Sequence, residues 1–199
     1  MTRPANLELP SRILDEAESI VAAEGYAALN LRTVARRVQV TATTIYHYYE
    51  NKDDLLLQLK LRTAEKLNRR IDGIDPSLPP YEALLELAVE YIGFAEEHPH
   101  LYLLLIETQI GEDALSDSDR NVLYHTYYTA RGFLERFPDR EGGPGDPRYE
   151  AMMGWVMLHG FCSLLLSGSF QLVENVDRNT LKGLFLRFYG GEGGRKYKP

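Results

Sequence analysis

A short stretch near the N-terminus groups side chains that can bind phosphates and the edges of bases. Between Leu31 and Tyr49 the chain has three arginines and no acidic residue. Several positions in and just after this stretch carry hydroxyl, phenol, imidazole or cationic groups, which hydrogen-bond to phosphate oxygens and base edges. The candidate nucleic-acid contacts are Arg32, Thr41, Thr43, Thr44, Tyr46, His47, Tyr48 and Lys52.

These residue types can contact different parts of DNA. Arg32 can reach a guanine edge with two hydrogen bonds, and the threonine hydroxyls can contact bases or phosphates. Lys52 brings a charge together with a nearby helix N-terminus, which suits one more phosphate. The alternative interpretation is a solvated helix face on which threonines cap a turn, because helix-turn-helix geometry also occurs in proteins that bind no DNA.

The elements that must position these side chains are two short helices joined by a tight turn. Apolar residues at Leu31, Val34, Ala35 and Val38 follow helical spacing, and the polar run from Thr41 restarts a helix through Tyr48. Ala35 is the small residue that such a helix crossing needs. Before them, a helix is expected with Ser11 as N-cap and Gly25 as its stop. The pattern predicts a three-helix unit with a helix-turn-helix.

Helical spacing continues beyond this unit, and no run shows convincing strand alternation. We expect an all-α fold of about nine helices: an N-terminal helix-turn-helix domain at 1–52, a long linking helix at 52–71, and a helical regulatory domain at 53–190. The tail at 191–199 is expected to be disordered. The later helices are expected at 81–97, 99–110, 119–137, 148–166 and 177–189.

Composition limits the compartment and the partners. The formal net charge is −7, but residues 1 to 70 carry 11 basic and 9 acidic side chains, against 11 and 20 in residues 71 to 199. The basic excess is therefore near the candidate DNA contacts. The only cysteine, Cys162, excludes a disulfide framework within the chain. The polar N-terminus lacks the apolar core of a secretory signal, so a cytoplasmic protein is expected.

The run from Leu31 to Leu56 resembles the N-terminal signature of TetR-family regulators. It has the Val-Ala pair in the first short helix, the tyrosine-rich cluster at the end of the second, and then Asn51-Lys-Asp before a leucine-rich helix. The resemblance implies DNA contacts at Arg32, Thr43, Thr44, Tyr46, His47 and Lys52, with Thr41 as the cap of the recognition helix. It also implies a bacterial repressor associated with the nucleoid through DNA.

Two positions depart from the family pattern. Gln39 stands in the turn where the family commonly has glycine, so a left-handed backbone there would cost roughly 1 kcal/mol. Tyr48 stands where a histidine often precedes the final aromatic residue, which weakens the inference for its role.

The acidic C-terminal part is rich in aromatic residues, and buried tyrosines need hydrogen-bond partners. We therefore expect a small-molecule pocket with polar groups, although core packing is the plainer explanation for any one ring. The effector would be apolar, aromatic or cationic. Residues Trp155, His159 and Gly160 resemble a signature of one branch of the family. The predicted pocket consists of Phe94, Tyr102, Tyr124, Tyr128, Trp155 and His159.

No Asp, Glu, Lys or Arg occurs in the 23 residues from Ala151 to Val173. This length would suffice for a membrane span, but glycines, serines and His159 dilute its hydrophobicity and neither flank is strongly basic. We expect no membrane span and instead a helix shielded by a second copy in a homodimer, which would read a palindromic operator. The predicted interface residues are Leu158, Phe161, Leu165, Leu181, Leu184 and Phe188.

Catalytic, metal and cofactor motifs do not stand out. The chain has no G-x-S-x-G elbow or P-loop, and the pairs His98 with His100 and His159 with Cys162 are too sparse for a convincing metal site. We expect no enzyme, metal or cofactor. The leading hypothesis is a repressor released by a small molecule. The alternatives are a DNA-binding dimer without effector, and a helical dimerisation or transport module whose helix-turn-helix is structural.

Overall fold

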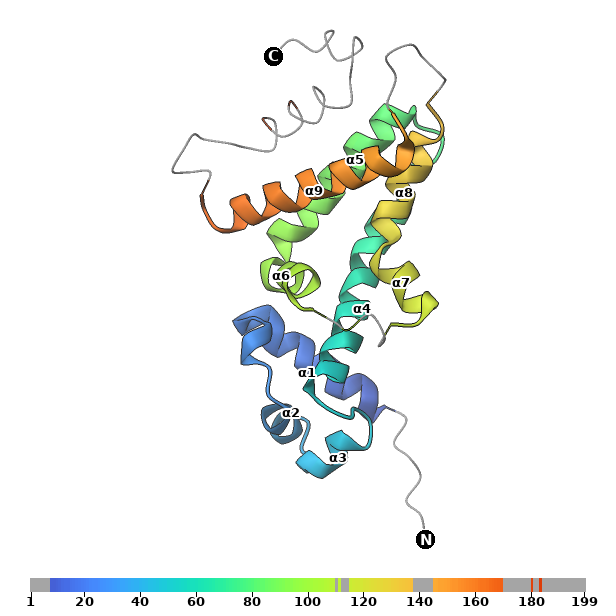
Figure 1. Ribbon diagram of the computed structural model, residues 1–199. Coiled ribbons are helices and arrows are strands. Elements are labelled where there is room, and N and C mark those ends of the chain that lie inside the picture. The colour runs from blue at the N-terminus through green and yellow to red at the C-terminus, as the bar shows by residue number, and fades with distance from the viewer. Residues whose placement is uncertain are drawn as a thin grey trace. The chain divides into compact units, whose positions relative to one another are not determined.

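The computed structural model describes residues 8–109, 111, 115–137, 145–169, 180 and 183. Over these residues the chain forms nine α-helices and one short 3-10 helix, with no strand (Figure 1). The predicted all-α class is therefore confirmed. The helices are α1 (Leu9–Glu24), α2 (Leu31–Arg37), α3 (Ala42–Tyr46), α4 (Lys52–Asp72), α5 (Pro80–Glu97), α6 (Pro99–Glu107), α7 (Asp117–Leu123), α8 (His125–Leu134) and α9 (Pro147–Leu166), with the 3-10 turn η1 at Tyr26–Ala28.

Some predicted helix boundaries were wrong. α1 begins at Leu9, so Ser11 lies inside its first turn and is not the N-cap. Pro10 in the first turn explains the earlier start, because proline lacks the N–H that would be unpaired there in any case. The expected helix at 119–137 is two helices, α7 and α8, which are broken at Tyr124. The expected helix at 177–189 lies almost wholly outside the described residues.

Contacts between Cα atoms divide the chain into two compact units. The first unit comprises Met1–Glu65 and His98–Arg120, and the second comprises Lys66–Glu97 and Asn121–Pro199. This division differs from the expected boundary at residues 52 and 53 in two ways: the first turns of α4 belong to the first unit, and α6 groups with the N-terminal helices. The position of the boundary between independently folding domains stays a prediction. The expected disordered tail at 191–199 lies outside the described residues.

An apolar cluster in the first unit joins side chains from five helices. α1 supplies one face of helical spacing, α2 and α3 add theirs, and α4 contributes leucines from its first turns. Leu101 and Leu104 of α6 complete the cluster. Its members include Ile13, Ala17, Ile20, Val21, Leu31, Val34, Ala35, Val38, Ile45, Leu55 and Leu59. Burial of this surface is the main force that holds the short helices α2 and α3 in place.

Polar contacts at both ends fix α6 to the rest of the first unit. At its start, the His100 ring lies 3.0 Å from the carbonyl oxygen of Ala22. At its end, the Tyr26 hydroxyl donates to Glu107 over 3.0 Å. The Lys60 ammonium donates to the carbonyl oxygen of Thr108 over 2.7 Å, and burial lowers the pKa of this lysine. α6 is thus built into the unit that contains the helix-turn-helix.

Three long helices, α5, α8 and α9, pack against one another in the second unit (Figure 1). α5 buries most of one side, including Leu84, Leu87 and Tyr91. Polar contacts tie the last turns of α4 into this unit. The side-chain amide of Asn68 donates to the Val122 carbonyl oxygen over 2.9 Å, and Arg70 pairs with Glu97 at the end of α5.

Candidate DNA-binding surface and effector pocket

Two of the three arginines of α2 are exposed without an ion-pair partner among the described residues, and the third forms an ion pair within the first unit. The Asn30 side chain caps the helix by accepting from the N–H of Arg32 over 2.9 Å. Arg32 and Arg36 are both exposed and lie four residues apart, hence on one face. Arg37 instead pairs with Glu16 at 2.8 Å. The cationic charge that α2 leaves for a partner is therefore carried by Arg32 and Arg36.

The turn between α2 and α3 has the left-handed backbone that the sequence led us to consider. Gln39 has φ +61°, and it is the only described non-glycine residue with a positive φ. Its N–H donates to the Arg36 carbonyl oxygen over 3.2 Å, and the Val40 N–H donates to that of Ala35 over 2.9 Å. This pair of bonds is a Schellman motif. A glutamine at its left-handed position costs about 1 kcal/mol more than a glycine.

α3 buries one side chain and leaves the others partly or fully exposed. Thr41 is the N-cap, as predicted, and its hydroxyl accepts from the Thr44 N–H over 3.2 Å. The hydroxyls of Thr41 and Thr44 also lie 2.8 Å apart, so Thr44 is partly committed to the cap. Ile45 faces the apolar cluster. Thr43 and Tyr46 are exposed, the latter at 54%.

The residues after α3 extend this exposed surface toward α4. His47 and Tyr48 are exposed, whereas Tyr49 is buried and its hydroxyl donates to the Pro10 carbonyl oxygen over 3.1 Å. Burial raises the pKa of Tyr49, and the nearby Asp54 carboxylate raises it further. Lys52 is the first residue of α4 and is half-exposed. The sequence-predicted residues thus share one stretch, and all of them retain solvent-accessible surface.

Two side-chain hydrogen bonds to backbone N–H groups fix the start of α4. The Asn51 side chain accepts from the Asp54 N–H over 2.9 Å, and the Asp54 carboxylate accepts from the Glu50 N–H over 3.0 Å. This arrangement resembles a capping box, except that the Asp54 carboxylate accepts from the N–H of Glu50 and not from that of the N-cap residue Asn51. These hydrogen bonds therefore hold the backbone at the start of α4, where Lys52 lies.

Four side chains of the second unit form a continuous aromatic row. The rings of Tyr124 and Trp155 lie 6.1 Å apart, and those of Trp155 and His159 lie 4.8 Å apart, both edge to face. The Tyr91 hydroxyl lies 3.1 Å from Nδ1 of His159. Burial lowers the pKa of His159 to about 4. The imidazole is therefore neutral at pH 7, and it can both donate and accept one hydrogen bond.

The six residues predicted for the pocket are only partly brought together. Tyr124, Trp155 and His159 share the aromatic row, but Tyr102 lies in α6 and belongs to the first unit. Phe94 is buried beside the Arg70 guanidinium, and Tyr128 is 47% exposed and contacts Tyr127. Sequence reasoning left Tyr91 out of the pocket, because no local pattern links it to His159 across 68 positions.

A small cavity lies beside this row, between α5, α8 and α9. Its water-accessible volume is about 20 Å³, room for about one water molecule. No charged side chain lines it, and its polar groups come from Thr126, Tyr127 and Trp155. The remaining lining residues are Leu84, Leu87, Ala130, Ala151, Gly154 and Leu158. A larger ligand would have to displace side chains to enter.

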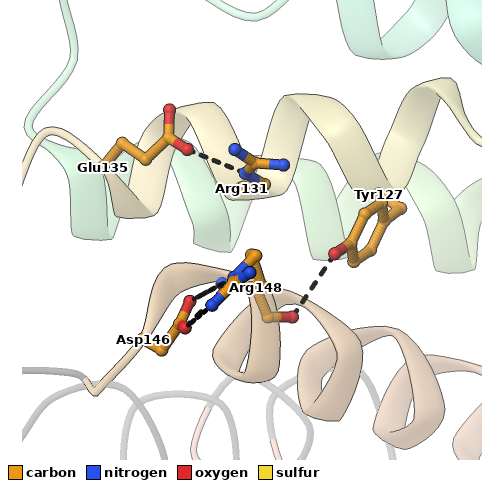
Figure 2. Close-up of polar contacts among 5 residues, drawn as sticks. All are labelled: Tyr127, Arg131, Glu135, Asp146 and Arg148. Atoms are coloured by element: carbon orange, nitrogen blue, oxygen red, sulfur yellow. Dashed lines mark hydrogen bonds and ion pairs between the residues drawn. The ribbon is translucent and has the colours of Figure 1, made fainter.

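The N-terminal end of α9 is capped by Asp146 and makes a polar contact with α8, as Figure 2 shows. Asp146 caps α9 by accepting from the Arg148 N–H over 2.9 Å, and the two side chains also form an ion pair. This pair lowers the pKa of Asp146 to about 2. The Tyr127 hydroxyl of α8 reaches the Arg148 carbonyl oxygen at 3.5 Å, next to the Arg131 and Glu135 pair (Figure 2). These contacts set where α9 starts.

α9 buries one side and leaves an apolar stripe exposed. Two predicted interface residues, Leu158 and Phe161, are buried within one chain, so little of their surface is left for a second copy. Leu165 is half-buried, whereas Leu181, Leu184 and Phe188 lie outside the described residues. The stripe, which sequence spacing alone did not single out, consists of Tyr149, Met152, Met153, Val156 and Leu164.

Length and composition alone would let one described helix, α9, cross a membrane. Core helices of globular proteins pass the same test. Across the described ranges no group of three or more His, Cys, Asp or Glu side chains could hold a metal ion.

Comparison with known families decides the identity of these two units. Residues 13–59 match the family model of bacterial regulatory proteins of the tetR family, and residues 84–182 match the model of a tetracyclin repressor-like C-terminal domain. The chain belongs to the TetR family of transcriptional regulators. It is therefore a DNA-binding regulator, and its α2 and α3 are the helix-turn-helix of that family.

Individual TetR-family relatives agree with this assignment. A helix-turn-helix transcriptional regulator of Mycobacterium tuberculosis is 21% identical over 181 residues, which are 91% of this chain and 79% of that protein. The repressor KstR of Mycolicibacterium smegmatis is 35% identical over 68 residues, 34% of this chain and 33% of KstR. The fold resembles that of FadR from Bacillus subtilis in complex with stearoyl-CoA, with TM-score 0.64, 18% identity, and coverage of 91% and 98% of the two chains.

Proposed function

We propose that this TetR-family regulator is a homodimeric repressor that binds a palindromic operator and leaves it when a small molecule binds the second unit. The observation that carries the DNA-binding part is the exposed surface of α2, α3 and the start of α4. There, Arg32, Thr43 and Tyr46 point away from a fully packed apolar interior. A surface of cations, hydroxyls and phenols has no use in packing but matches phosphates and base edges.

The exposed stripe of α9 supports the proposed dimer. A contiguous row of large apolar side chains on a helix indicates a protein interface. The stripe continues into Gly160 and Ser163, which are also exposed and small enough for a second helix to approach closely. We therefore place the interface on Met152, Met153 and Val156, and not on Leu158 and Phe161. Two copies would present two recognition helices to related half-sites.

The aromatic row and its small cavity are the proposed effector site. Tyr91 and His159 of the row supply neutral hydrogen-bonding groups. The cavity beside them is lined mainly by apolar side chains, with polar groups from Thr126, Tyr127 and Trp155. Because no carboxylate lines the cavity, an apolar or aromatic effector fits it better than a cation. FadR, one of the proteins with a similar fold, was crystallised with an acyl thioester of coenzyme A, stearoyl-CoA.

Helix α4 offers a mechanical link, because its first turns belong to the first unit and its last turns to the second. In the second unit, His125 pairs with Asp72 at 2.7 Å and Asn68 binds the Val122 carbonyl oxygen. Tyr124, which contacts Trp155, lies between Val122 and His125. An effector that moves Trp155 would shift these anchors of α4. The two recognition helices must stay about 34 Å apart to enter successive major grooves, so DNA affinity would fall.

We infer no catalytic activity for this regulator, and we expect it in the cytoplasm, associated with the nucleoid through DNA. The nucleophile and base pair that catalysis needs is lacking from the motifs of the sequence. A hydrolytic or transfer activity of the purified protein would contradict this part of the proposal.

The decisive experiment is selection of duplexes from a random DNA pool by the purified full chain at near-physiological salt. Molecular mass is measured in the same preparation by light scattering. We expect a dimer and an enriched palindrome. A monomer, or a pool without an enriched sequence, would overturn the proposal.

A further inference from the structure

The left-handed turn at Gln39 does not need the glutamine side chain. Both hydrogen bonds of the turn use main-chain atoms, and the left-handed φ of +61° is strained for any residue with a Cβ. α9 ends with the same two bonds, made by the N–H groups of Gly168 and Ser169, and there the left-handed position is a glycine with φ +69°. Fold stability therefore does not explain why Gln39 carries a side chain.

The Gln39 side chain is available to a partner. The residue is exposed, and among the described residues its amide makes no hydrogen bond. It stands two residues before Thr41, the cap of the recognition helix, and next to the half-exposed Val40. The N-terminal residues of a recognition helix are the ones that meet base edges in the major groove. Gln39 thus lies immediately before the recognition-helix residues that are proposed to contact DNA.

The carboxamide group of glutamine is complementary to one base, adenine. A carboxamide offers a donor and an acceptor side by side, and this pair matches N7 and the N6 amino group of adenine. A non-glycine residue that is held in a strained backbone conformation is also a reason to look for a function, because the strain must be outweighed elsewhere.

We propose that Gln39 is a specificity-determining residue that reads an adenine in each half-site of the operator. The proposal rests on the proposed function, since it requires a sequence-specific DNA complex. It adds to the threonine, tyrosine and arginine contacts a base contact from the turn itself, where a glycine would offer none. Its loss should change which sequences are bound without harming the fold.

The test compares wild type with Gln39→Gly and with Gln58→Ala. Gln58 is an exposed glutamine of α4 and serves as the matched control. Each full-length protein selects duplexes from a random pool, and its affinity is measured for the selected site and for sites with each other base at every position. Thermal unfolding of the three proteins is followed by circular dichroism.

We expect wild type and Gln58→Ala to prefer adenine at one position of each half-site by roughly 5- to 150-fold, the discrimination of a bidentate amide and adenine pair. Gln39→Gly should lose this preference at that position alone, while its melting temperature equals or exceeds that of wild type. Unchanged base preferences in Gln39→Gly would overturn the proposal, and so would an equal loss of affinity for all sequences, which indicates a phosphate contact. If wild type enriches no sequence at all, the proposed function fails first.

Discussion

The two units expose different chemistry on helices of different length. α3 has five residues, buries Ile45 and turns Thr43 and Tyr46 outward. α9 has twenty residues, buries one side on α5 and α8, and still exposes Met152 and Val156. Among the described residues, the first unit thus presents a polar surface at α3, whereas the second exposes an apolar stripe on α9. This difference is the basis for the two partners that we propose: a nucleic acid for the first unit and a second copy of the chain for the second.

The largest effect is expected from a charge placed on the α9 stripe. Val156→Glu would bury a carboxylate in the proposed interface, which is strongly unfavourable without a partner charge. We expect the dimer to dissociate at micromolar concentration and operator affinity to fall at least about 100-fold, which is roughly 2.7 kcal/mol. Light scattering and binding titrations measure both. Asn121→Glu, at an exposed position of α7, is the control. A Val156→Glu protein that stays dimeric would remove the contrast between the units.

The second effect concerns the half-buried imidazole of His159 in the second unit. The pKa of His159 is about 4 in the folded chain and about 6.5 in an unfolded one, because burial disfavours its charge. Above pH 6.5 the group is neutral in both states. As the pH falls from 6.5 to 4, the unfolded chain binds a proton that the folded chain does not, so stability is lost, by up to about 3 kcal/mol.

Urea unfolding at pH 7 and pH 4.5 measures this loss. His159→Gln keeps a hydrogen-bonding group for Tyr91 but cannot titrate, so it should lose less stability than wild type over the same interval. Equal losses in the two proteins would show that other groups cause the acid sensitivity.

The third effect distinguishes two kinds of contact on the polar surface. Lys52→Ala should weaken binding to all sequences by about 1 kcal/mol and reduce the salt slope by about 1, because a phosphate contact is lost. Thr43→Ala should instead change which bases are preferred, since its hydroxyl is not engaged in the cap as that of Thr44 is. Titrations over a series of salt concentrations, with selected and random duplexes, test this division. Identical uniform losses in both variants would contradict it.

The smallest effect compares the two left-handed helix ends. Gly168→Ala should cost about 1 kcal/mol, because alanine is strained at φ +69°. Gln39→Gly should gain a similar amount, since in both substitutions the change in strain is partly offset by the greater freedom of glycine in the unfolded chain. Chemical denaturation measures both. A stabilising Gly168→Ala would show that the strain argument does not apply to these turns.

The sequence predicted the helix-turn-helix well, because its signals are local. The apolar spacing of α2, the cap at Thr41 and the left-handed turn at Gln39 all depend on residues a few positions apart. The recognition of the family from this segment was confirmed. The DNA contacts themselves stay predictions.

The second unit was harder to predict, because its arrangement depends on long-range packing. Periodicity identified α9 as apolar on nearly every side but could not tell which side faces α5 and α8. Leu158 and Phe161 were therefore assigned to the outer side, although both are buried in one chain. The break at Tyr124 was also missed, since the residues around it have no glycine or proline to indicate an end.

The position of α6 affects how domains can be exchanged between regulators. The unit that carries the helix-turn-helix is discontinuous in sequence, because Leu101 and Leu104 fill its core from a segment that follows α5. A chimera that joins residues 1–72 of this chain to a foreign sensor would leave that core open, unless the new partner brings an equivalent helix. Recombination, in the laboratory or in evolution, should therefore succeed more often when α6 travels with the DNA-reading helices.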